Sequence, residues 1–160
     1  MSEFEERLRA AAARGSQKSI SREELAASKK ASHDRLRGLH TKLRLQLSER
    51  IDLVVKKLID QFPGFRFESV FGEIGWGAAC TRDDLRLTAG RRETRYSRFE
   101  MAVRPVNEFL VLDLHAKGTV GNKEVLLRNY YQPLADVDPV KFQHLIEEWA
   151  LSFAELYAAS

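Results

Sequence analysis

The sequence lacks the features of a secreted or membrane-spanning protein. Cys80 is the only cysteine among 160 residues, which excludes an intrachain disulfide framework. No apolar run approaches the roughly 18 residues needed to span a bilayer. The N-terminal stretch MSEFEERLRA has no apolar core of a secretory signal. We therefore expect a cytoplasmic protein of a reducing compartment that does not enter a membrane.

Residue patterns for metal or nucleotide binding are missing as well. The four histidines are far apart in the sequence: His33, His40, His115 and His144. They form no HExxH motif and have no cysteine pair beside them, so no metal site is predicted. Three glycines at 72, 75 and 77 lack the Lys-Ser/Thr pair and the helix that complete a phosphate-binding loop. We expect no cofactor, and we interpret these glycines as tight turns or bulges in a sheet.

Bulky apolar side chains are scarce at the start of the chain. Residues 1–35 hold five of them, whereas residues 36–62 hold twelve. The first segment cannot bury enough apolar area to offset its own ordering entropy. The sequence therefore predicts an N-terminal arm over 1–35, helical or disordered, and a single domain over 36–160.

Residues 36–62 carry the apolar spacing of one face of a helix. The stripe consists of Leu36, His40, Leu43, Leu47, Ile51, Val54, Leu58 and Phe62. Gly38 is a place where this helix could begin or bend, and Pro63-Gly64 ends it. A helix of this length reaches about 40 Å, longer than the roughly 26 Å diameter of a domain of about 100 residues. We expect the excess apolar stripe to be covered by the arm, a partner or a second copy.

From residue 65 the apolar period changes to two, which predicts strands. The last segment is a helix that begins after Asp138-Pro139 and carries a broad apolar stripe. The expected strands lie at about 65–71, up to 80, 85–87, 98–104, 109–114 and 124–131, with a loop at 89–94 and a turn at 118–122. The predicted fold class is α+β: a long N-terminal amphipathic helix, an antiparallel sheet of four to six strands, and a C-terminal amphipathic helix on one sheet face.

The segment from Arg82 to Arg104 has the most suggestive composition. It holds seven arginines and no lysine, against four carboxylates. The arginines are Arg82, Arg86, Arg91, Arg92, Arg95, Arg98 and Arg104. Guanidinium groups bind phosphate in a bidentate manner, and Tyr96 is interleaved with them as a stacking residue. This pattern fits a nucleic-acid surface. A charge run is more often a solvated face, here a hairpin whose arginines pair with the four carboxylates or with helix ends.

Four other residues are candidates for a binding or catalytic site. Trp76, in the glycine-rich stretch, is expected to be an exposed contact residue. Asp113 and His115 are two apart on a strand and share a sheet face, where they could line a pocket. Cys80 could be a nucleophile with His115 as its base, although a buried structural cysteine explains the residue as well.

Three functional hypotheses remain open at this point. The first is a non-catalytic protein-interaction or ligand-binding module that self-associates through its long helix or its open sheet face. The second is a nucleic-acid-binding protein that uses residues 82–104. The third is a small-molecule-binding protein or an enzyme with a pocket on the sheet face.

Overall fold

The computed structural model describes residues 2–160, and Met1 lies outside the described residues. By their internal contacts, the residues divide into two compact units, Met1–Arg37 and Gly38–Ser160. The elements are α1 (Glu3–Gln61), β1 (Arg66–Val70), β2 (Trp76–Thr88), β3 (Arg91–Val103), β4 (Val111–Val120), β5 (Lys123–Pro133), the 3-10 helix η1 (Leu134–Asp136) and α2 (Pro139–Ala158). The predicted α+β fold is confirmed.

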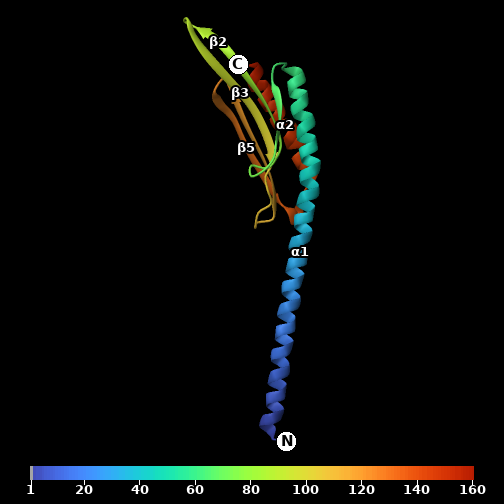
Figure 1. Cartoon of the computed structure of the whole chain (residues 1–160). Helices are drawn as coiled ribbons and strands as arrows, with labels where there is room; N and C mark the ends of the chain where they lie inside the picture. Colours follow the sequence, from blue (N-terminus) through green and yellow to red (C-terminus); the bar gives the residue numbers. More distant parts are fainter. Residues whose placement is uncertain (1) are drawn as a thin grey trace. The chain divides into compact units, whose positions relative to one another are not determined.

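The second unit consists of one antiparallel sheet with helices on one face (Figure 1). Its five strands are neighbours in sequence order, from β1 to β5. The ring of Phe153 on α2 stacks on Phe99 of β3 with centroids 4.9 Å apart. The guanidinium of Arg44 on α1 lies 4.0 Å from the ring centroid of Trp76 on β2. Within residues 2–160, no helix packs on the other face of the sheet.

The apolar stripe of α1 contributes one side of the core. Its buried residues are His40, Leu43, Leu47, Ile51, Val55 and Leu58. The helix begins at Glu3, and both Gly15 and Gly38 are helical residues within it. In the first unit, none of residues 2–37 is buried. This agrees with the shortage of apolar side chains there.

The predicted boundaries within 76–104 were wrong. β2 runs without interruption from Trp76 to Thr88, and β3 already begins at Arg91. The expected loop at 89–94 is reduced to Ala89-Gly90, whose φ angles of 53° and 78° are those of a two-residue hairpin turn. Polar residues on both faces of this hairpin hide the alternation that marks a half-buried strand.

The end of the chain folds as its local signals require. The carboxylate of Asp138 accepts a hydrogen bond of 3.1 Å from the backbone N–H of Val140 and so caps α2. Pro139 occupies the first turn, where its missing N–H is not needed. The buried side of α2 is formed by Phe142, Leu145, Ile146, Trp149, Ala150 and Phe153. These residues fix α2 against the sheet beside α1.

Candidate functional site

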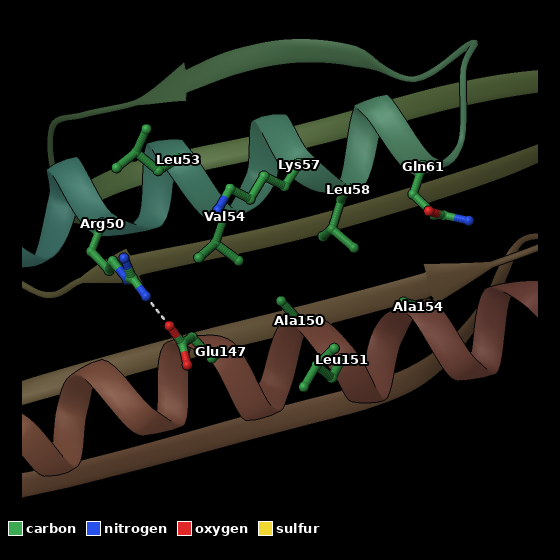
Figure 2. A pocket seen from close by; sticks show the side chains of 10 residues that line it. All are labelled: Arg50, Leu53, Val54, Lys57, Leu58, Gln61, Glu147, Ala150, Leu151 and Ala154. Carbon is green, nitrogen blue, oxygen red and sulfur yellow. Dashed lines mark hydrogen bonds and ion pairs between the residues drawn. The ribbon is translucent and has the colours of Figure 1, made fainter.

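An apolar groove lies between α1 and α2 (Figure 2). Its volume is about 390 Å³. It is lined by Arg50, Leu53, Val54, Lys57, Leu58, Gln61, Glu147, Ala150, Leu151 and Ala154. The small side chains of Ala150 and Ala154 create the hollow, since they leave space that larger residues would fill. An ion pair between Arg50 and Glu147 joins the two helices across one end of the groove.

Two leucines of this groove are largely exposed. Leu53 keeps 54% of its surface accessible and Leu151 keeps 69%. Sequence reasoning missed the groove, because neither helix sequence reveals which distant helix will pack beside it. The available signal was that Leu53 lies off the main apolar stripe of its helix.

The two helices that form the groove carry opposite net charge. Residues 38–61 of α1 hold five Lys and Arg against three Asp and Glu, whereas α2 holds one lysine and three glutamates. The groove is therefore an apolar strip with a basic helix on one side and an acidic helix on the other.

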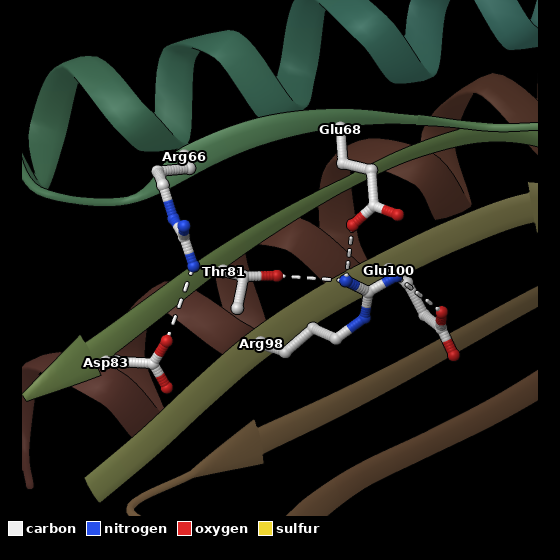
Figure 3. A network of polar contacts seen from close by, with 6 residues as sticks. All are labelled: Arg66, Glu68, Thr81, Asp83, Arg98 and Glu100. Atoms are coloured by element: carbon white, nitrogen blue, oxygen red, sulfur yellow. Dashed lines mark hydrogen bonds and ion pairs between the residues drawn. The ribbon is translucent and has the colours of Figure 1, made fainter. Parts of the chain in front are cut away.

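The uncovered face of the sheet carries a polar network centred on Arg98 (Figure 3). Its Nη1 donates to Glu68 at 2.8 Å and to Thr81 at 2.9 Å, and its Nη2 donates to Glu100 at 3.3 Å. Nearby, Arg66 pairs with Asp83 at 3.3 Å. Arg98 is thus held by two carboxylates, and its charge is already compensated within the sheet.

A second polar cluster on this face contains Asp113 and His115. The Nδ1 of His115 lies 2.9 Å from Oδ1 of Asn129 and 3.2 Å from Nη2 of Arg104. The Nε of Arg104 lies 3.6 Å from Oδ2 of Asp113. Burial raises the pKa of Asp113, and the nearby charges of Arg104 and His115 oppose this effect. The structure brings these residues together, and a ligand-binding role for them stays a prediction.

Cys80 and His115 are placed on opposite faces of the sheet. Cys80 pairs with Phe99 and His115 pairs with Ala102, three positions further along β3. Because side chains alternate along a strand, an odd separation puts them on different faces. Burial raises the pKa of the Cys80 thiol to about 11. The hypothesis of a Cys80–His115 catalytic pair is therefore wrong.

Trp76 is half-buried rather than an exposed residue of a turn. It is the first residue of β2 and packs under Arg44 of α1. Tyr96 is also half-buried, and its backbone N–H donates to Oδ1 of Asn122 at 2.8 Å. Trp76 thus contributes to the packing of α1 on the sheet, and a contact role for either ring remains a prediction.

The seven arginines of residues 82–104 divide into two groups. Arg82, Arg98 and Arg104 lie within 4 Å of a carboxylate oxygen. Arg82 also donates to the carbonyl of Pro63 at 2.8 Å. Within residues 2–160, no ion pair includes the remaining four, which are Arg86, Arg91, Arg92 and Arg95.

Other classes of site, and likeness to known proteins, give no further assignment. In the part of the chain that the structure describes, no three His, Cys, Asp or Glu side chains gather as metal ligands. No helix within residues 2–160 combines the length and the apolar character required to cross a membrane. No protein-family model, curated protein or solved structure matches the chain.

Proposed function

We propose that the chain is a protein-interaction module that binds a second copy of itself through the outer surface of its two helices. The observation that carries this proposal is the groove between α1 and α2, with Leu53 and Leu151 exposed beside it. Surfaces of this kind, apolar in the middle and charged at the rim, are typical of protein interfaces.

The charge of the two helices favours a second copy as the occupant. In a twofold dimer, α1 of one subunit can face α2 of the other, and the reverse contact forms by symmetry. The basic α1 then meets the acidic α2 twice. This arrangement complements charge at both contacts and places the exposed leucines at the centre of the interface.

The available area is sufficient for a stable dimer. A helix of 20 residues such as α2 is about 30 Å long. Two neighbouring helices, each about 10 Å wide, offer a footprint of about 600 Å² per subunit. Standard interfaces bury roughly 800 Å² of accessible surface per partner, and side chains make accessible area larger than a flat footprint.

Light scattering coupled to size-exclusion chromatography tests the proposal on the full chain. At about 50 μM the wild type is expected to have twice the mass of the 18.3 kDa chain. Leu151→Lys adds a cation that faces the basic α1 of the other subunit. Because each dimer contains two copies of residue 151, the loss of about 1.5–3 kcal/mol per buried leucine weakens dimerisation at least about 100-fold.

Leu127→Lys on β5 is the matched control. Leu127 is 52% exposed, similar to Leu53, but it lies on the sheet face away from the helices. This variant should remain dimeric. A wild type that is monomeric at this concentration, or a dimer that Leu127→Lys disrupts and Leu151→Lys does not, contradicts the proposal.

A further inference from the structure

The far half of the β2–β3 hairpin forms a two-stranded ribbon. β1 pairs with β2 only as far as Thr81, and β4 pairs with β3 only from Arg98 onward. Beyond these positions, the only ladder partners of residues 82–88 of β2 are residues 91–97 of β3. Gly121 and Asn122 of the β4–β5 turn hydrogen-bond to the base of this ribbon at residues 94–97, and the part nearer the tip has no such support within residues 2–160. A ribbon of two strands has little stability of its own in water. Packing in the core therefore does not explain why this ribbon is long and rich in charged residues.

The two faces of this ribbon differ in chemistry. Residues that pair directly across antiparallel strands share a face. One face carries Arg82, Asp84, Arg86, Thr88, Arg91, Glu93, Arg95 and Ser97, and we name it the arginine face. The opposite face carries the exposed Leu85 and Leu87 together with Asp83, Arg92, Thr94 and Tyr96.

The arginine face has more positive charge than its own carboxylates compensate. Asp84 is occupied by Arg82, whose Nε donates to it at 2.9 Å. Glu93 lies opposite Arg86, but within residues 2–160 the ion pairs include neither of them. Arg86, Arg91 and Arg95 are thus three guanidinium groups without a carboxylate partner on one side of a narrow ribbon.

A cavity lies at the base of this face. Its volume is about 360 Å³. It is lined by Arg82, Asp84, Arg86, Arg95, Ser97, Val120, Gly121, Tyr157, Ala158 and Ser160. Three of these residues are arginines of the arginine face. The cavity can hold an anionic group within reach of several guanidinium forks, which bind phosphate oxygens in a bidentate manner.

We propose that the arginine face binds the phosphate backbone of a nucleic acid. Arg91 and Arg95 are four residues apart on one strand, and so are Arg82 and Arg86 on the other, which gives a separation of about 14 Å. A duplex strand rises 3.4 Å per phosphate along the helix axis, so a ribbon that lies along this axis covers the rise of about four phosphates. A row of cations of this length fits a polymer of phosphates rather than one isolated phosphate. The major groove of a duplex is wide enough to admit a two-stranded ribbon.

The distribution of apolar residues argues against an anionic membrane as the ligand. Leu85 and Leu87 lie on the face opposite the arginine face. A ribbon that inserted its leucines into lipid would turn Arg86, Arg91 and Arg95 away from the headgroups. Binding of a nucleic acid requires only the arginine face. It does not depend on the dimer proposed above.

Fluorescence anisotropy with a labelled 20-base-pair duplex tests the proposal on the full chain. We expect binding that weakens with salt between 50 and 200 mM. The triple variant R86Q/R91Q/R95Q should lower the slope of log affinity against log salt by about three, about one for each phosphate contact. Its affinity at 100 mM salt should fall at least about tenfold. R86K/R91K/R95K keeps the positive charge but loses the bidentate guanidinium groups. Its affinity should lie between those of the wild type and the Gln variant.

A control variant removes the same charge elsewhere. Lys117, Lys123 and Arg128 are exposed, lie outside the ribbon and belong to none of the ion pairs within residues 2–160. Replacing all three with Gln should leave the slope nearly unchanged. An equal loss in both Gln variants, or no duplex binding at 20 mM salt, overturns the proposal. So does binding of inorganic pyrophosphate without binding of the duplex. Binding to vesicles containing phosphatidylserine that requires Leu85 and Leu87, without duplex binding, also overturns it.

Discussion

Gly118 gives the most direct test of how α2 packs on the sheet. It lies on β4, where the pairing with β5 shifts register between Gly118 and Thr119. A Cβ added at this position would lie 2.9 Å from Cδ2 of Phe153 and 3.2 Å from Cβ of Leu126. Both distances are shorter than ordinary van der Waals contact. Gly118→Ala must therefore displace the ring of Phe153 or the strand beneath it.

The size of the effect follows from two opposing contributions. Overpacking a tight core costs about 1–3 kcal/mol, while Ala in a strand is favoured over Gly by about 0.5–1 kcal/mol. The net loss of unfolding free energy is about 1–2 kcal/mol. For the roughly 120 residues of Gly38–Ser160, the entropy of unfolding is about 0.25 kcal/mol/K. Gly118→Ala should thus lower Tm by about 4–8 °C, measured by circular dichroism.

Two further variants make this prediction specific. Gly38→Ala is the same substitution in α1, where no heavy atom lies within 4 Å of the added Cβ, and it should raise stability by about 1 kcal/mol. Phe153→Leu in the Gly118→Ala background should relieve the contact between the ring and the added Cβ. The unfolding free energy of the double variant should then exceed the value expected from adding the losses of the two single variants, by about 0.5 kcal/mol or more. Strictly additive losses, or a Gly118→Ala protein that melts at the wild-type temperature, would refute the packing argument.

Two other predictions concern buried groups. The Nε2–H of His40 donates to the carbonyl of Arg104 at 3.1 Å, and burial lowers the pKa of His40 below its ordinary 6.5. The unfolded chain therefore binds the proton more readily, and the unfolding free energy should fall as the pH drops below about 6.5. Urea melts between pH 5 and 8 should show a smaller fall for His40→Gln than for the wild type. An identical pH profile for the two proteins would contradict this assignment. The pKa of the Cys80 thiol is raised to about 11. At neutral pH, the thiol should therefore react with a disulfide reagent far more slowly in the folded protein than in urea. Equally fast labelling of the folded chain would show that the thiol is accessible.

The helices could be predicted from the sequence because their signals are local. The 3.6-residue spacing from Leu43 to Leu58 identifies the buried face of α1. Asp138 and Pro139 mark the start of α2. Both signals depend only on residues within a few turns, so no knowledge of the partner surface is required.

The glycines near Trp76 show why the strand boundaries could not be predicted. In the sequence they indicate a flexible turn, whereas Gly77 is a paired residue of β2. A Cβ there would overlap the backbone carbonyl of Met101 on β3. Gly77 is thus required by the close approach of a neighbouring strand, and this neighbour is 24 positions away in the sequence.

The candidate sites divide in the same way. Asp113 and His115 could be placed on one face from their spacing alone. The separation of Cys80 from His115 depends on the register of three strands, since it follows from the pairing of both residues with β3. The sequence shows that the β2–β3 ribbon is rich in arginine. It does not show which of these arginines lack a carboxylate partner, because the partner of Arg98 is Glu68 on another strand.

The order of the strands has a consequence for the rate of folding. Each strand pairs only with its neighbours in the sequence, so the sheet can grow one hairpin at a time without closing a long loop. The contact between α1 and α2 is different, since Arg50 and Glu147 are 97 positions apart. Local contacts form fast, whereas distant contacts must overcome a larger loss of chain entropy. The sheet can therefore assemble before the two helices meet, and the groove between them is among the last parts of the molecule to form.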